Sequence, residues 1–346
     1  MLTKRELLQS GALAVIAAAT TTAGPALAQM LTGAPAKPDL KYSTPMPAGV
    51  ASPDKVETRL GTLNFFDGFP DKASAEKLFD NLDFQRAVQA YLFAIPAVSQ
   101  VANRDAFEEF GPPNTVVPIF EELLDSRGIV LTGNDNTVYS WTWIDLKDGP
   151  VVLEVPPKVL GTANDMWQRW VVDVGVTGPD KGRGGKYLFL PPGYKGSVPK
   201  RGYYVVHSPT FGLWVPWRSF LVHGDPKPGV DLVKKFTKIY PLAGAGKKHP
   251  RLKFVDMSGK PFNTVYPADY RFWELLHKVV QEEPTASLDQ IRLGYFQSIG
   301  IQKDKPFAPD ERMKKILTEA AAVGGRHRAF CAFPYARQIC LLLFQQ

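Results

Sequence analysis

The sequence predicts an α+β fold in which an antiparallel β-sandwich is flanked by an N-terminal helix and a C-terminal helical segment. The first observation is a hydrophobic pattern of period two from Gly128 to about residue 225, interrupted by glycine, proline and Asn-Asp turns. The second is a period near 3.6 on either side of that region, which is typical of amphipathic helices. The third is composition, because 346 residues that are 45% hydrophobic and 12% aromatic can bury sizeable cores. The length predicts two domains.

Residues 1–28 have the pattern of a secretory signal peptide. Lys4 and Arg5 precede an uncharged stretch that ends in the small-x-small site Ala26-Leu27-Ala28. Three threonines, a glycine and a proline shorten the apolar run below the ~20 residues of a membrane span, so we expect cleavage after Ala28 rather than an anchor. The segment "TKRELLQ" also resembles a twin-arginine signal with one arginine replaced, which leaves open the choice between Sec and twin-arginine export. We therefore expect a periplasmic or secreted protein with no transmembrane span after processing.

The segments that precede the sandwich are a linker and a helical segment. Residues 29–55 are rich in Pro, Ala, Ser and Lys and lack a period, so they predict a flexible linker. Residues 56–127 predict an N-terminal helical segment that packs on the sandwich. Its main helix begins near Ser74, a typical N-cap residue, and Pro96 is expected to end or kink it. A short helix is expected at about residues 119–124.

Residues 128–225 predict the sandwich itself. Seven candidate strands lie at residues 129–133, 137–146, 150–155, 168–176, 186–190, 202–208 and 213–222. Because no helical pattern separates them, they favour antiparallel pairing over a parallel sheet. Residues 226–324 return to a helical period and predict a helical segment, whose last helix ends near Gly324.

The stretch "NDNTVYSWTWIDLKDGPVVLEVPP", residues 134–157, has the clearest alternation. On a strand, Tyr139, Trp141 and Trp143 share one face. One interpretation is an aromatic platform for a sugar ring or another flat ligand. The other is that the rings fill the sandwich core. We favour the core, because residues 150–155 follow at once as a natural hairpin partner.

Candidate catalytic residues are few. Asp135 lies in the turn before the aromatic strand, and Asp145 and Asp148 lie in the turn after it. Short acids that bond their own backbone are ordinary turn residues, although a pair of carboxylates also suits acid–base chemistry. His207 ends a strand where a loop can open to solvent. Asp135, Asp145 and His207 are therefore our candidates for a hydrolytic site.

The binding candidates come from the aromatic strands. Arg218 in "VPWRSF" suits an anionic ligand, and Tyr139 and Trp214 complete the set of ligand-binding candidates. The glycine-rich "GVTGPDKGRGGKYLFL" lacks the Ser or Thr that a phosphate loop has after its lysine, and a strand follows in place of a helix. It predicts a mobile hairpin loop. No two of the five histidines have ligand spacing, so we predict no metal site and no cofactor.

The net charge of +7 does not indicate a nucleic-acid partner. One unit lies in the signal segment and three lie in the last 22 residues, which leaves three for the body of the protein. That body has no arginine-rich helix and no aromatic-basic sheet pattern, so binding to nucleic acid is not predicted. The expected partner is a small molecule or an envelope ligand, and the sequence does not predict an oligomeric state.

The composition changes abruptly after Gly324. Residues 325–346 contain both cysteines, Cys331 and Cys340, with arginines, aromatics and no acid. Two alternatives are a native C-terminal strand and a tail translated out of frame, with the true continuation lost. We favour the second, because a break in local consistency is typical of an unselected sequence.

Several blocks together carry a family resemblance. They are "TRLGTLNFFDGFP", "NDNTVYSWTWIDLKDGPVVLEVP", "GKYLFLPPGYKG", "HSPTFGLWVPWRSFL" and "SIGIQKDKPFAPDERMKKILTEAAAVG". From about Val56 to Gly324 the chain resembles exported bacterial proteins with domain of unknown function 1254. The resemblance implies an immunoglobulin-like sandwich, a helical segment and then domain of unknown function 1214, which is missing or truncated here. The family's usual Leu-Gly-Arg is replaced by Pro216-Trp217-Arg218, and the resemblance implies no catalytic residue.

Two functional hypotheses follow. The first is an exported envelope protein that binds a ligand or partner without catalysis. The alternative is a periplasmic hydrolase that uses carboxylate and histidine groups at the edge of the sandwich. The residues alone do not decide whether the protein is an enzyme.

The signal-peptide prediction has a direct test. Expression of the full-length gene in a bacterial host, followed by intact-mass measurement of the periplasmic protein, is expected to show a mature N-terminus at Gln29. Replacement of both Ala26 and Ala28 by bulky residues is expected to block cleavage, because the protease needs small side chains at those positions. An unprocessed protein that remains in the membrane fraction would contradict the prediction.

Overall fold

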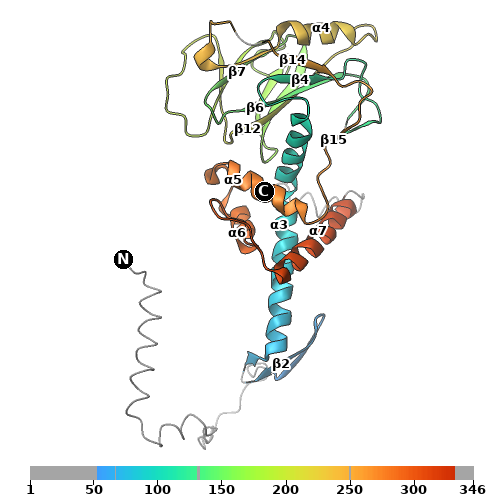
Figure 1. Ribbon diagram of the computed structural model, residues 1–346, viewed down its shortest axis with the longest axis vertical. Helices are drawn as coiled ribbons and strands as arrows, with labels where there is room; N and C mark the ends of the chain where they lie inside the picture. The colour runs from blue at the N-terminus through green and yellow to red at the C-terminus, as the bar shows by residue number, and fades with distance from the viewer. Residues whose placement is uncertain (1–52, 67, 131–132, 249–250, 332–346) are drawn as a thin grey trace, which may run out of the picture. The chain divides into compact units, whose positions relative to one another are not determined.

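The fold is described from a computed structural model, shown in Figure 1. The structure describes residues 53–66, 68–130, 133–248 and 251–331, with side chains at the C-terminal end only as far as Arg326. The predicted signal peptide, residues 29–52 of the predicted linker and residues 332–346 of the predicted tail lie outside these ranges. The chain divides into two compact units, residues 1–71 and 72–346.

The described part of the first unit is a small antiparallel ribbon of three strands. They are β1 (Lys55–Thr58), β2 (Gly61–Phe66) and β3 (Phe69–Pro70). The turn between β1 and β2 is closed by Thr58, whose Oγ1 accepts a hydrogen bond from the Leu60 N–H (3.0 Å) and donates to the Gly61 carbonyl (2.9 Å). Such local side-chain bonds are what make threonine a turn residue.

The second unit begins with the long helix α3 (Lys72–Glu108). The sequence predicts that the main helix ends or kinks at Pro96. The helix does not end there, because it continues for twelve further residues. A proline removes one helical hydrogen bond, which costs about 3 kcal/mol in an exposed helix. Here Ala94, Ala97 and Val98 around the proline are all fully buried, and this packing offsets the loss.

Ten strands of the second unit form two main sheets. The six-stranded sheet has the order β14 (Lys253–Asp256), β4 (Val116–Ile119), β6 (Val138–Asp145), β12 (Gly212–Ser219), β8 (Val159–Asp165) and β9 (Trp170–Gly175). The four-stranded sheet has the order β11 (Tyr204–His207), β10 (Gly185–Leu190), β7 (Val151–Val155) and β13 (Lys238–Pro241). A further pair joins β5 (Gly128–Ile129) to β15 (Phe262–Asn263). Most neighbours are antiparallel, but β14–β4, β10–β11 and β15–β5 are parallel.

The two main sheets pack face to face, which confirms a mixed α and β fold with sandwich-like sheets. Their facing side chains form one continuous apolar core, with Ile144 of β6, Leu153 of β7, Phe189 of β10 and Trp217 of β12 among its members. The helix α4 (Lys227–Phe236) adds Val230 and Val233 to this core.

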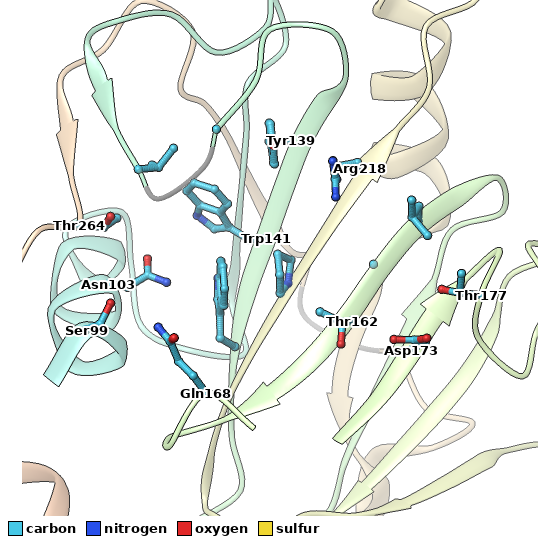
Figure 2. Close-up of a pocket in the computed structure, with 16 residues that line it drawn as sticks. Ser99, Asn103, Tyr139, Trp141, Thr162, Gln168, Asp173, Thr177, Arg218 and Thr264 are labelled. Atoms are coloured by element: carbon cyan, nitrogen blue, oxygen red, sulfur yellow. The ribbon is translucent and has the colours of Figure 1, made fainter. Parts of the chain in front are cut away.

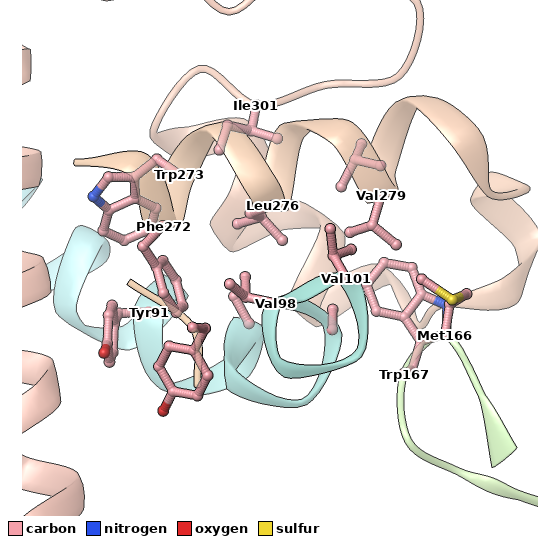
Figure 3. Close-up of a cluster of buried hydrophobic side chains, with 14 of the residues drawn as sticks. Tyr91, Val98, Val101, Met166, Trp167, Phe272, Trp273, Leu276, Val279 and Ile301 are labelled. Atoms are coloured by element: carbon pink, nitrogen blue, oxygen red, sulfur yellow. The ribbon is translucent and has the colours of Figure 1, made fainter. Parts of the chain in front are cut away.

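The other face of the six-stranded sheet contributes side chains to a helical cluster. The cluster is formed by α3, α5 (Arg271–Glu282), α6 (Gln290–Ser298) and α7 (Glu311–Cys331), and Figure 1 shows the last three grouped around α3. Figure 3 shows Tyr91 and Val98 of α3 packed against Phe272 and Leu276 of α5, in the cluster that also holds Trp141 and Trp143 of β6. In the described residues, no helix has both the length and the apolar character needed to cross a membrane.

Several sequence predictions about connections are wrong. Residues 150–155 are not the hairpin partner of the aromatic strand, because β6 pairs with β12 and β4, whereas β7 pairs with β10 and β13 in the other sheet. The predicted helix at 119–124 is the end of β4 followed by a turn. Alternation indicates that a strand has two different faces, but it does not select the neighbour of the strand. The strands β8, β13 and β14 are absent from the sequence prediction.

The glycine-rich segment is organised by a buried acid. It connects β9 in one sheet to β10 in the other, so it is not a hairpin loop. Asp180 is fully buried and accepts hydrogen bonds from the N–H groups of Gly175 (2.8 Å) and Gly184 (2.9 Å) and from the hydroxyl of Tyr187. Burial and this hydrogen bond raise the pKa of Tyr187. The backbone N–H groups of these glycines therefore bind the protein's own carboxylate and not a phosphate.

The last helix runs past the point where the composition changes. The sequence predicts an end near Gly324, but α7 continues to Cys331. At Gly324 an added Cβ would lie 2.4 Å from Cδ1 of Tyr91, so glycine is needed where α7 crosses α3. The ring of Tyr91 is held in place because it stacks on Phe272 at 4.0 Å and meets Trp273 edge-on.

This contact gives a stability prediction. The substitution Gly324→Ala is expected to lower the free energy of unfolding by about 1–3 kcal/mol, because the buried Tyr91 ring cannot move aside. Gly294→Ala on the exposed face of α6 is the matched control, since nothing lies within 4 Å of its added Cβ. The control is expected to be neutral or stabilising by up to ~1 kcal/mol, as for any exposed helical glycine. Urea denaturation of both variants checks this, and equal stabilities would contradict the close crossing of α3 and α7.

Candidate functional site

The register of the six-stranded sheet determines which side chains lie next to one another on the face away from the sandwich core. In one row, Tyr139 of β6 lies opposite Arg218 of β12, which lies opposite Leu160 of β8. In the next row, Trp141 lies opposite Pro216. Thr162 of β8 lies opposite Asp173 of β9. Residues that are directly opposite share a face, so these side chains all project from the same side of the sheet.

A cavity of about 400 Å³ lies on this face. Its lining combines side chains of four neighbouring strands with the polar residues Ser99 and Asn103 of α3. Figure 2 shows Ser99 and Asn103 at one side of the cavity and Thr162 and Asp173 at the other, with Tyr139 and Trp141 between them. The full lining is Ser99, Asn103, Val130, Gly133, Tyr139, Trp141, Leu160, Gly161, Thr162, Gln168, Asp173, Thr177, Trp214, Pro216, Arg218 and Thr264. An apolar, aromatic floor with a few polar groups at its rim is typical of a small-molecule site.

Burial decreases along the aromatic strand toward the cavity. Trp143 is 1% exposed, Trp141 is 4% exposed, and Tyr139 is half-buried. The centroids of Trp141 and Trp214 are 6.3 Å apart, and the guanidinium carbon of Arg218 lies 5.7 Å from the centre of the Tyr139 ring. The helices therefore cover one end of the strand and leave rings accessible at the other.

One charged group of the cavity has hydrogen-bonding donors without a partner. Among the described residues, Arg218 forms no ion pair. The indole nitrogens of Trp141 and Trp214 also have no hydrogen-bond partner among these residues, but both atoms are buried and do not open to the cavity. The indoles of Trp143 and Trp217 elsewhere in the sheet are also without a partner among these residues, so this property alone does not mark the cavity. Asp173 accepts a hydrogen bond from the indole N–H of Trp170 at 2.9 Å.

The structure brings together the predicted ligand-binding residues. Tyr139, Trp214 and Arg218 all line the cavity, although the sequence interpretation favours the sandwich core for the rings of the aromatic strand. That preference is wrong, because these rings face the helices and the sandwich core takes Val138 and Ile144 instead. The cause is that the sheet is covered on both sides, which alternation along one strand does not reveal.

The predicted hydrolytic residues are not brought together. Asp135 and Asp145 lie at opposite ends of β6, whose eight residues span roughly 23 Å. The Asp145 carboxylate instead accepts the Lys147 N–H at 2.8 Å, as a turn residue does. His207 is exposed at the end of β11, in the other sheet. Asp145 is therefore an ordinary turn residue, which is the structural one of its two interpretations.

Sequence reasoning missed most of the polar rim. Asn103 is on the helix, and Thr162 and Asp173 are on paired strands, one of which is absent from the sequence prediction. No local pattern distinguishes these residues from ordinary polar positions. Gln168 adopts a left-handed φ of 57° in the turn after Trp167, a feature that only the structure shows. Such a conformation is uncommon for a residue other than glycine.

A second, more open cavity of about 910 Å³ is lined by seven cations and one acid. Lys238 is on β13 and Lys253 is on β14, the edge strands of the two sheets. Lysines on edge strands prevent pairing with other chains, which accounts for these two residues. Glu154 lies within 4 Å of both Lys186 and Lys238, and Lys234 is paired with Glu121. We therefore assign Lys238 and Lys253 to edge protection.

A third cavity of about 160 Å³ lies where α5 meets the start of β12. Arg104 of α3 donates two hydrogen bonds to Glu282, at 2.5 and 3.2 Å. The neighbouring Glu283 is 1% exposed and accepts the N–H groups of Phe211 (2.6 Å) and Gly212 (3.0 Å). Both of its oxygens are occupied by backbone, so Glu283 ties the helical layer to the sandwich rather than facing a substrate.

No group of three or more His, Cys, Asp or Glu side chains is placed to hold a metal ion in the part of the chain that the structure describes. The cavity on the sheet likewise has one acid and no histidine or cysteine among its lining residues. What the arrangement offers is an aromatic floor, hydroxyl and amide groups, one cation and one anion.

Residues 113–241 match the family described as Protein of unknown function (DUF1254). This match supports the resemblance to the domain of unknown function 1254, and it spans all four strands of the cavity floor but not α3. The expected domain of unknown function 1214 stays a prediction. No curated protein matches the sequence.

Two solved structures are similar in part to the chain. The VPA0106 protein from Vibrio parahaemolyticus is 20% identical with a TM-score of 0.53, over 72% of this chain and 59% of that one. An uncharacterised protein from Burkholderia cenocepacia is 13% identical with a TM-score of 0.24, over 51% of this chain and 52% of its own. The first likeness concerns the fold alone. The chain spans less than two thirds of the length of either protein.

The buried Glu283 predicts a pH dependence of stability. Burial raises its pKa from 4.5 to about 7, although two backbone N–H groups oppose the shift. Because the folded state holds the proton more tightly than the unfolded state, the unfolding free energy should fall as pH rises from about 4.5 through 7, by about 3 kcal/mol. The loss is complete about one pH unit above the folded pKa.

The variant Glu283→Gln isolates this contribution. Chemical denaturation of both proteins between pH 4.5 and 8 is expected to show that the decline in the wild type is absent or much smaller in the variant. The substituted amide has one oxygen and can accept only one of the two N–H groups, so the variant is expected to be less stable than the wild type at pH 5. Parallel pH profiles for the two proteins would contradict the assignment.

Proposed function

We propose that this protein binds a small polar ligand with a flat ring, such as a sugar, in the cavity on the six-stranded sheet, and does so without catalysis. The observation that carries the proposal is the lining. Tyr139, Trp141 and Trp214 provide aromatic surface, and Asn103 and Thr162 provide an amide and a hydroxyl at opposite sides. Sugar rings have apolar faces and polar edges, which match aromatic floors with polar rims.

The size of the cavity is consistent with this occupant. A volume of about 400 Å³ lies within the ~300–1,000 Å³ range of ligand sites. The binding residues are also held by rigid elements, since four strands and one helix carry most of them. A site with few mobile parts loses little conformational entropy when a ligand binds.

The non-catalytic part of the proposal rests on separation. A hydrolytic mechanism needs an acid and a base within hydrogen-bonding reach of one substrate. His207 is on β11 of the four-stranded sheet, whereas Asp135 and Asp145 are at the two ends of β6 in the six-stranded sheet. Asp173 is the one acid in the lining of the cavity. The hydrolase alternative therefore has no specific observation in its favour.

Three further features remain proposals. The signal-peptide pattern of residues 1–28 supports action at the cell envelope or outside the cell. The two packed sheets support an immunoglobulin-like classification of the sandwich, as the family resemblance implies. The same resemblance supports a partner domain of unknown function 1214 in longer relatives.

A thermal-shift screen of the mature protein with neutral sugars, lipids and phosphates tests the binding function. At least one ring-bearing compound is expected to raise the melting temperature at saturating concentration, because a ligand that binds only the folded state stabilises it. The variant Thr162→Trp is expected to abolish the shift by filling the cavity. Thr318→Trp, at an exposed position of α7, which contributes no residue to the lining, is the control and should respond as the wild type does.

The screen also separates the two functional hypotheses. No stabilisation by any compound, together with turnover of one of them, would replace binding with catalysis. Stabilisation that persists in Thr162→Trp would place the site elsewhere.

A further inference from the structure

Arg218 is a half-buried cation without a counter-charge among the described residues. It lies on β12, in the interior of the six-stranded sheet, and faces the cavity. Its guanidinium carbon lies over the ring of Tyr139 at 5.7 Å, and no described acid is within ion-pair distance. The ring contact holds the arginine side chain against the sheet without using its N–H donors.

The protein pairs its other sheltered arginines. Arg104 is 7% exposed and meets Glu282 with two hydrogen bonds. Arg292, whose side chain is 34% exposed, is paired with Asp289. Against this pattern, Arg218 stands out because its donors have no partner among the described residues, and a partly desolvated cation without a partner is unfavourable.

Asp173, the other charged residue of the lining, is too far away to neutralise Arg218. It is two strands from Arg218 across the sheet and two residues along, which places the Cα atoms roughly 12 Å apart. Figure 2 shows the same separation, with Arg218 beside Tyr139 and Asp173 beside Thr162 and Thr177. The Asp173 carboxylate is also held by the indole of Trp170, which is 68% exposed.

The cavity therefore has a positive end and a hydroxyl-binding end. At the Arg218 end, a planar guanidinium suits a carboxylate, which it binds with two parallel hydrogen bonds. At the other end, Thr162 and Asp173 suit hydroxyl groups, since a carboxylate accepts hydrogen bonds from them. The low dielectric of an aromatic floor strengthens both interactions.

We propose, on the basis of the binding function above, that the ligand is an acidic sugar: a hydroxylated ring whose carboxylate pairs with the guanidinium of Arg218. The ring lies along the aromatic floor, and its hydroxyl groups bond to the polar rim. A neutral sugar fills the same cavity but leaves Arg218 unpaired, so it binds more weakly. The shape of the cavity thus determines that a ring binds, and the charge of Arg218 determines the preference for an acidic ring over a neutral one.

Isothermal titration of the mature protein with galacturonate and galactose tests the proposal. The two probes differ in one group, because galacturonate has a carboxylate where galactose has a hydroxymethyl group. Galacturonate is expected to bind at least about tenfold more tightly at low ionic strength, as for one charge-assisted pair. Added salt is expected to reduce this advantage, because it screens a partly exposed charge pair.

Three variants connect the effect to the arginine. Arg218→Gln is expected to remove the preference for galacturonate, so that the variant binds galacturonate and galactose with affinities within about threefold of each other, since only uncharged contacts remain. Arg218→Lys is expected to retain part of the preference, because lysine keeps the charge but loses the planar fork. Arg201→Gln, at an exposed loop position outside the cavity, is the matched control and should behave as the wild type.

Each outcome decides a different point. Galactose binding without tighter binding of galacturonate would overturn the acidic-sugar assignment and leave the binding function standing. A preference that persists in Arg218→Gln would overturn the role of Arg218. Absence of binding by both probes would count against the sugar class as a whole, and galactose binding by the variant shows that it is folded.

Discussion

The burial of the six-stranded sheet on both faces is the constraint on which the rest of the structure depends. On β12, Trp217 points into the sandwich core and is 1% exposed, while Trp214, three residues earlier, faces the helices. Adjacent residues of a strand project to opposite sides, so one strand serves two different cores. The sandwich and the helical cluster are thereby held together by shared strands rather than by a separate interface.

This arrangement also explains why a cavity lies where it does. The helices contact the sheet around Trp143 and Val116, both of which are buried, but they do not extend over the row of Tyr139 and Arg218. The uncovered part of an otherwise buried sheet face keeps its large aromatic side chains. It then presents an apolar surface that is bordered by α3 on one side and by β9 on the other. The cavity is thus a consequence of incomplete helical cover.

Buried charges have two different roles in this protein. Asp180 accepts hydrogen bonds from backbone groups at the two ends of the loop between β9 and β10, and Glu283 accepts them from the start of β12 and so joins α5 to the sheet. Arg104 and Glu282 satisfy one another. Each of these groups is explained by its protein partners, and removal of one partner would leave an uncompensated buried charge. Arg218 differs because its side chain faces a cavity, where a bound ligand can supply the counter-charge.

The sequence by itself determined the local features: the strand at residues 137–146, the alternation of its side chains, the helices after residue 267, and the family resemblance of the sandwich region. These follow from short-range geometry, because period two and period 3.6 are properties of neighbouring residues. It also singled out Tyr139, Trp214 and Arg218. Only the tertiary structure decided that β6 pairs with β12 instead of β7, that the tryptophans face helices, and that Asn103 and Asp173 belong to the same cavity. Pairing and layer order depend on contacts between residues far apart in the chain, and a local pattern carries no information about which distant surface will cover a given face.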